Sequence, residues 1–224
     1  MCGVTKSMMN DFMSVLQHNW PRLVTAFGQH VQIALISVCF GALISVPLGI
    51  ALTRCPKIGQ KVIAVLSILQ TVPSMVMFGL LLPLSGIGRP TAIIVLTLYS
   101  ILPILRNTYT GISDVSASYV EAAKGMGMNS RQVLFKVELP IALPVIVTGI
   151  RLSSVYIISW STVATIVGGG GLGDIIFMGV TRHNHAIILM GAIPASFLAI
   201  LTSFVIGKIA KAVTPRGLRR ERAS

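Results

Sequence analysis

Long runs of apolar residues, separated by short polar segments, dominate the chain from residue 31 to residue 213. A helix needs roughly 20 apolar residues to cross the ~30 Å hydrocarbon core of a bilayer. Five runs reach or approach this length, the third being the shortest: residues 31–53, 62–84, 91–106, 141–167 and 186–213. The pattern predicts an all-α integral membrane protein, with about five transmembrane helices per subunit in a domain spanning residues 31–213.

The N-terminal segment, residues 1–30, is less apolar and includes the stretch HNWPRLVTAFGQH. It is expected to form an interfacial helix with Trp20 as an anchor rather than a sixth span. No apolar core followed by a cleavage site occurs near the start, so a signal peptide is not expected.

Composition agrees with a membrane location and narrows the possible partners. Of 224 residues, 54% are hydrophobic and 11% are charged, whereas soluble domains carry about 25% charged residues. The net charge of +12 would suggest nucleic-acid binding in a soluble protein. Because the basic residues lie between the apolar runs, the positive-inside bias of membrane proteins explains them better, and no nucleic acid is expected as a partner.

The same basic residues predict an orientation. Those on the richer side of the membrane are Arg54, Lys57, Lys61, Arg106, Lys124, Arg131, Lys136, Lys208, Lys211, Arg216, Arg219, Arg220 and Arg222. Those on the other side are Lys6, Arg22, Arg89 and Arg182, while Arg151 falls within the fourth run. The bias places the N-terminus outside and the C-terminus in the cytoplasm, with the basic tail 214–224 against the anionic lipid of the inner leaflet.

Small residues recur at every fourth position of the first run, at Ser37, Gly41, Ser45, Gly49 and Thr53. Such a stripe lets a neighbouring backbone approach closely, so it predicts a helix-packing face. Prolines inside or at the edges of the runs predict kinked helices. They are Pro47, Pro73, Pro83, Pro103, Pro144 and Pro194.

The segment from Tyr119 to Pro140 is the longest polar stretch between apolar runs. Residues 121–132 have a helical pattern that Gly125 and Gly127 interrupt, and glycine permits a sharp turn there. Pro140 is expected to turn the chain into the fourth span. A short helix pair of this kind suits insertion into a partner's groove, although an ordinary solvated loop helix fits the pattern equally well.

Within this segment, Glu121-Ala122-Ala123, Gly127, Val137 and Leu139-Pro140 occur at fixed gaps. They resemble the EAA signature of bacterial ABC-importer permeases, EAA-x3-G-x9-I-x-LP, with Val137 in place of Ile. The resemblance extends over nearly the whole chain from about residue 29 and implies a type I ABC importer transmembrane domain. It implies that the cytoplasmic segment 115–140 couples to an ATPase through Glu121, Ala122, Ala123, Gly125, Gly127, Leu139 and Pro140.

The partners follow from the same resemblance. It implies two ATPase subunits, a second permease that is identical or paralogous, and an extracytoplasmic substrate-binding protein at a bacterial cell membrane. Residues 70–88, 98–112 and 166–179 look most like permeases for osmoprotectants such as glycine betaine, carnitine and choline. The methionine-importer permease shares the five-span layout and remains the alternative.

No nucleotide, metal or other cofactor is expected on this chain. A Walker A pattern is absent from the sequence, so ATP and Mg²⁺ are expected on the partner ATPase. The stretch GGGGLGD (168–174) is predicted to be a flexible external loop or span end. His183 and His185 have no further candidate ligands nearby, and no cysteine spacing indicates a metal site.

Candidate path residues are Tyr99, Ser153, Tyr156 and Trp160, because aromatic faces hold quaternary ammonium groups well. Helix packing or interfacial anchoring would account for the same residues. Arg151 is expected to snorkel to the cytoplasmic interface, the alternative being an inward position near the path.

Three other classes of protein fit less well. An intramembrane enzyme lacks paired acids, a metal triad or a Ser/His dyad within any predicted span, and an ion-driven transporter lacks an acidic residue in a span core. A non-transporting membrane scaffold that binds a partner through residues 119–140 remains open. Only the permease predicts ATP-dependent solute uptake.

Overall fold

The computed structural model describes residues 2–214, with side chains described from residue 13, and every regular element in this range is helical. The elements are α1 (Cys2–Thr53), α2 (Pro56–Thr71), α3 (Ser74–Ser85), α4 (Arg89–Ser113), α5 (Ala117–Gly125), α6 (Ser130–Val133), η1 (Leu134–Glu138), α7 (Leu139–Ser161), η2 (Val163–Val167), α8 (Leu172–Thr181) and α9 (His185–Val213). The predicted all-α class is confirmed.

Apolar helical stretches long enough to cross a membrane are Met13–Thr53, Arg89–Ser113, Ser130–Ser161 and His185–Val213. The pair α2 and α3 makes a fifth if counted as one bent span. The prediction of about five spans is therefore confirmed. Residues 2–30 are helical and continue directly into the first span, while their interfacial placement stays a prediction. Of the predicted tail 214–224, all but Thr214 lies outside the described residues.

The second span differs from the single helix predicted over residues 62–84. It breaks into α2 and α3, whose axes differ by 96°. Val72 is extended, with φ −65° and ψ 126°, and Pro73 is the N-cap of α3, which begins at Ser74. The residue before a proline is disfavoured in the α conformation, so the break falls where the sequence places Pro73.

The third span is longer than the predicted residues 91–106. Helix α4 continues to Ser113, so Arg106 is an exposed residue within a helix rather than in a loop. Within this added part of the helix, Asn107 Nδ2 donates to the carbonyl oxygen of Pro103, one turn back, at 2.8 Å.

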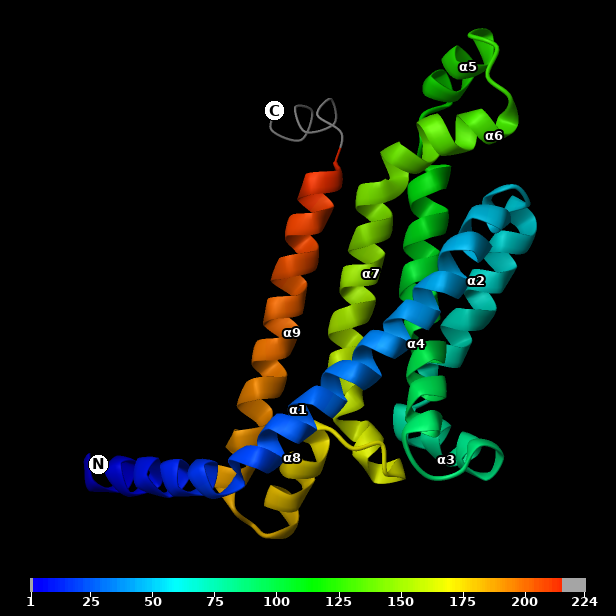
Figure 1. Ribbon diagram of the computed structural model, residues 1–224. Helices are drawn as coiled ribbons and strands as arrows, with labels where there is room; N and C mark the ends of the chain where they lie inside the picture. Colours follow the sequence, from blue (N-terminus) through cyan, green and yellow to red (C-terminus); the bar gives the residue numbers. More distant parts are fainter. Residues whose placement is uncertain (1, 215–224) are drawn as a thin grey trace.

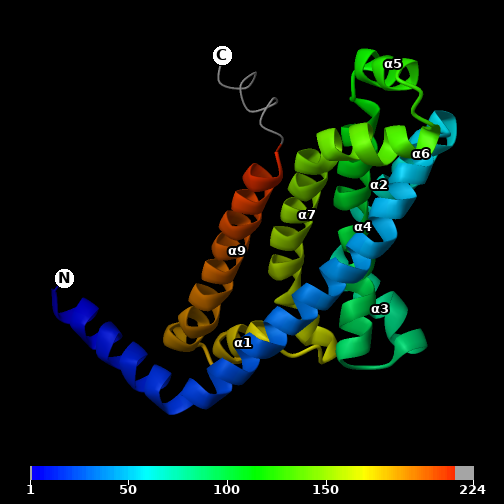
Figure 2. The ribbon, with the colours of Figure 1, turned by 45° about the horizontal axis from the view of Figure 1, so that its top comes forward.

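Helices α4, α7 and α9 run side by side, and α1 crosses them obliquely (Figures 1 and 2). The corner between α1 and α2, the α5–α6 pair and the C-terminal end of α9 lie at one end of the bundle. Helices α3 and α8 lie at the other end. The connections rich in basic residues are thus gathered at one end, as the charge pattern predicted.

The stripe of small residues on α1 packs against α4, which confirms the predicted packing face. The hydroxyls of Ser37 and Ser45 are fully buried and donate to α4 carbonyl oxygens at 3.4 and 3.1 Å. At Gly41, an added Cβ would lie 1.7 Å from the hydroxyl oxygen of Ser100 on α4. A side chain at this position would therefore collide with the side chain of Ser100. Thr53 instead bonds within its own helix.

The glycine-rich stretch lies at the end of the fourth span, between η2 and α8, as in the span-end alternative of the prediction, and it packs against α1. The N–H of Gly171 donates to Oε1 of Gln29 on α1 at 3.1 Å, and a Cβ at Gly171 would lie 3.1 Å from the ring of His30. Nε2 of His30 in turn donates to the carbonyl oxygen of Ile158 near the end of α7, at 3.0 Å. These contacts pack the turn against α1, and the short apolar helix α8 follows it.

Candidate functional site

The segment 115–140 forms a helix pair that projects beyond the ends of α4 and α7 (Figure 1). Helix α5 ends at Gly125, and Gly127 takes φ +83°, a left-handed conformation that favours glycine. Asn129 and Gln132 then begin α6 with a reciprocal capping box, each side chain accepting from the other residue's backbone N–H at 2.9 Å. The predicted interruption of the helix at the two glycines is present.

The predicted coupling residues divide into exposed and packed positions. Glu121, Ala122, Gly125 and Gly127 are exposed, whereas Ala123 is buried. Leu139 and Pro140 lie at the start of α7 and are half-buried. The exposed members face outward, where a partner could reach them.

Sequence reasoning missed three large apolar side chains in the same segment, one on α5, one in the turn after it and one on η1. Tyr119 is 49% exposed, Met126 is 71% exposed and Phe135 is 63% exposed. Apolar residues inside an otherwise polar segment were the available signal. Exposed apolar groups rimmed by polar residues are typical of a protein contact surface.

A π-helical turn, η1, joins α6 to α7. The N–H of Leu139 donates to the carbonyl oxygen of Leu134, five residues earlier. Pro140 follows at once and has no N–H to donate, and its ring would crowd the carbonyl of a normal helical turn. The direction of the chain changes across this turn (Figure 1), as predicted for the approach to Pro140.

Three of the four predicted path residues come together. The rings of Tyr99 and Trp160 pack edge to face with centroids 4.7 Å apart, and the ring of Tyr156 stacks on Trp160 at 5.8 Å. Tyr99 is buried and Tyr156 is 43% exposed. Ser153 faces elsewhere: its buried hydroxyl donates to the carbonyl oxygen of Ser100 on α4 at 3.2 Å.

The aromatic cluster lies beside the break in the second span. Pro103 cannot donate to the carbonyl of Tyr99, four residues earlier, and Gln70 Nε2 supplies that hydrogen bond instead at 2.9 Å. The phenol of Tyr99 donates to the carbonyl oxygen of Val72 at the break. In membrane proteins, such irregular backbone is tolerated where it is buried in protein or lines a water-filled cavity.

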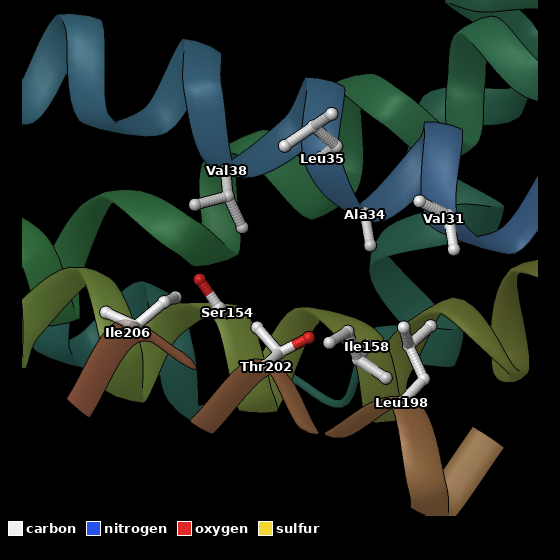
Figure 3. A pocket seen from close by; sticks show the side chains of 9 residues that line it. All are labelled: Val31, Ala34, Leu35, Val38, Ser154, Ile158, Leu198, Thr202 and Ile206. Atoms are coloured by element: carbon white, nitrogen blue, oxygen red, sulfur yellow. The ribbon is translucent and has the colours of Figure 1, made fainter. Parts of the chain in front are cut away.

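An apolar groove of about 140 Å³ lies elsewhere, between α1, α7 and α9 (Figure 3). Its polar side chains are Ser154 and Thr202, and the hydroxyl of Ser154 donates to a carbonyl of its own helix. It contains neither an aromatic ring nor a charged group. The groove therefore lacks the chemistry that a small charged solute requires.

Arg151 is exposed on α7, and its Nε donates to the hydroxyl of Ser203 on α9 at 2.9 Å. The guanidinium also lies against Gly207, next to Lys208. The side chain thus points along α9 toward the end of the bundle that holds the basic connections. This direction fits the snorkelling interpretation.

The fold is that of the transmembrane domain of an ABC importer. The inward-facing MetNI methionine ABC transporter contains a chain that superposes with a TM-score of 0.79 at 25% identity, covering 86% of this chain and 96% of that one. Residues 45–218 match the family model described as binding-protein-dependent transport system inner membrane component. The chain belongs to this family and is a transport subunit rather than an enzyme.

Two relatives match nearly end to end. The glycine betaine/carnitine/choline transport system permease protein OpuCB of Bacillus subtilis is 44% identical over 211 residues, which is 94% of this chain and 97% of that protein. The choline transport system permease protein OpuBB of the same organism is 43% identical, over 95% of this chain and 98% of that protein. The similarity to these permeases thus extends over nearly the whole chain.

Proposed function

We propose that this chain is the permease subunit of an ATP-driven importer for quaternary-ammonium osmoprotectants such as glycine betaine, carnitine and choline. The observation that carries the proposal is the 44% identity, over nearly the full length, to a permease named for these solutes. The similarity to the methionine transporter is weaker, at 25%. Methionine import is therefore the second candidate.

The solute path is proposed to pass the aromatic cluster of Tyr99, Tyr156 and Trp160. A quaternary ammonium group is attracted to aromatic faces, and the partly exposed ring of Tyr156 offers access from the surface of α7. Transporters commonly place solute sites at discontinuous helices, and the cluster lies at such a break. Packing between α4 and α7 remains the competing explanation for these rings.

The α5–α6 pair is proposed to dock on an ATPase subunit that binds ATP and Mg²⁺. The exposed apolar side chains of Tyr119 on α5, Met126 in the turn after α5 and Phe135 on η1 would fill a groove on that partner. This end of the bundle carries the excess of basic residues, so it is assigned to the cytoplasm. The N-terminus then lies outside and the C-terminus inside.

The complete importer is proposed to hold two permeases, two ATPase subunits and an external binding protein that delivers the solute. About five spans in one chain are too few to enclose a path, so a second permease is required. It is either an identical copy or a paralogue. ATP binding would favour one of two orientations of the spans, because an effector shifts a conformational equilibrium only through its differential affinity for the two states.

The test is uptake by the reconstituted complex in liposomes, with radiolabelled betaine, carnitine, choline and methionine compared. ATP and the binding protein are each added or withheld. Betaine-type uptake that requires both would support the proposal. Methionine uptake would show that the proposed solute is wrong but would leave the proposed transport mechanism unchanged. An assembled complex that hydrolyses ATP but takes up no solute would favour the scaffold alternative.

A further inference from the structure

An ion pair joins two parts of the chain that are 84 residues apart. Nη1 of Arg54 donates to Oε1 of Glu138 at 3.2 Å, and Nη2 of Arg54 donates to Oε2. The side chain of Glu138 is only 8% exposed, whereas that of Arg54 is 49% exposed. The forked, two-point contact fixes the orientation of both groups as well as their distance.

Both residues stand at junctions between helices. Arg54 directly follows the last residue of α1, in the corner that leads to α2, and its N–H donates to the carbonyl oxygen of Ala51 at 3.1 Å. Glu138 is the last residue of the π-helical turn and directly precedes α7. The pair therefore fastens the end of the first span to the joint between the coupling segment and the fourth span.

Burial makes this contact hard to break. A carboxylate removed from water needs a charged or hydrogen-bonding partner, and Arg54 donates both of the hydrogen bonds found at the carboxylate of Glu138. A partly buried pair is also screened by salt less than a pair in open solvent. Movement of Glu138 should therefore carry Arg54 with it.

We infer that the Arg54–Glu138 pair transmits displacement of the coupling segment to the first span, so that α1 and α4 move together with α7. The inference rests on the proposed docking of α5–α6 on an ATPase. Displacement reaches α7 through the continuous chain from Glu138 to Leu139. It reaches α1 through Arg54. Helix α4 is packed on both of these helices, on α1 through the stripe that includes Gly41 and on α7 through the hydroxyl of Ser153. Arg54 is thus a positioning residue for transport.

A purely structural role would also bury this pair, so the test must separate stability from transmission. Two single variants, Arg54→Glu and Glu138→Arg, each reverse one charge. The double variant carries both substitutions and so exchanges the two charges. Each variant is reconstituted in the full complex, and the solute taken up per ATP hydrolysed is measured. Lys57→Glu is the control, because Lys57 is an exposed basic residue in the first turn of α2, three residues from Arg54.

Each single reversal is expected to lower uptake per ATP by about tenfold in complexes that assemble and hydrolyse ATP, and the exchange should restore it to within about threefold. Lys57→Glu should stay within about twofold of the unaltered complex. If a reversal prevents assembly, Glu138→Gln keeps the shape of the side chain and should still lower uptake per ATP by at least about threefold.

Two results would overturn the inference alone: normal uptake per ATP in an assembled Glu138→Gln complex, or no recovery in an assembled complex carrying the exchange. Both require that the unaltered complex shows ATP-dependent uptake. Absence of such uptake in the unaltered complex would overturn the proposed function, and this inference with it.

Discussion

The phenol of Tyr99 donates a hydrogen bond of 2.5 Å to the carbonyl oxygen of Val72, the residue at which the second span breaks. A buried carbonyl without a partner is costly in a membrane. Because Tyr99 lies on α4, the bond ties the break to the centre of the bundle. The aromatic cluster and the break are therefore parts of one arrangement.

Removal of this single hydroxyl should destabilise the protein. Tyr99→Phe keeps the ring against Trp160 but leaves the Val72 carbonyl without its donor, which is expected to cost about 1–3 kcal/mol. Thermal unfolding in detergent, followed by tryptophan fluorescence, measures the change in Tm. Tyr156→Phe is the matched control because Tyr156 is partly exposed. Equal Tm values for the two variants would contradict the role of the bond.

The aromatic cluster should matter for the solute as well as for packing. Trp160→Phe retains a ring for a quaternary ammonium group, whereas Trp160→Leu retains apolar bulk alone. The loss of a cation–π contact is worth roughly 0.5–2 kcal/mol, so the Leu variant should transport betaine about two- to thirtyfold more slowly than the Phe variant. Uptake is measured with the loaded binding protein at saturation. Equal rates in the two variants would assign the cluster to packing.

The close approach of α1 and α4 gives a size-based prediction. Gly41→Ala would place a methyl group 1.7 Å from Ser100 Oγ and 2.9 Å from Ser100 Cβ, so Ser100 or the whole of α4 must shift, at a cost of about 1–3 kcal/mol. Gly28→Ala in the same helix meets no heavy atom within 4 Å and should be neutral or stabilising by up to about 1 kcal/mol. Unfolding by denaturant compares the two variants.

The contact can also be tested by compensation. Ser100→Gly removes both the hydroxyl and the Cβ that Gly41→Ala would meet, so the double variant should recover part of the lost stability. No recovery would mean that the cost arises elsewhere than at this contact.

The turn between α5 and α6 offers a matched pair of glycines. A Cβ at Gly127, with φ +83°, is strained by about 1–2 kcal/mol. Gly125 ends α5 without a left-handed φ, and a Cβ there meets nothing within 4 Å. Gly127→Ala should therefore weaken binding of the ATPase subunit by about five- to thirtyfold. Gly125→Ala should leave it nearly unchanged, and equal affinities would argue against this turn as part of the docking surface.

Hydrophobic periodicity and length were sufficient to place most of the spans. The fifth span, predicted from residue 186 to 213, agrees within one residue with α9. The packing face on α1 was also predictable, because small side chains at every fourth position lie on one face of a helix and let a second helix approach closely. These features depend on residues that are close together in the sequence, so a single sequence is enough to predict them.

Features that depend on distant contacts could not be predicted. Pro73 within the apolar run 62–84 predicts a kink, but nothing in the run gives its size of 96°. The contacts of the glycine-rich stretch with Gln29 and His30, some 140 residues earlier, have no sign in the local sequence. Arg54 and Glu138 likewise form an ion pair across 84 residues of sequence, and nothing near either residue indicates its partner.

The π-helical turn before α7 has a consequence for rotational register. Such a turn holds one residue more than an α-helical turn, so its conversion to a regular α-helical turn would rotate the following helix by roughly 100° relative to the preceding one. Pro140, directly after the turn, keeps it in place because proline cannot supply the N–H that a regular turn needs. Pro140 thus fixes the direction in which Tyr156 and Trp160 point around the axis of α7, relative to the coupling segment.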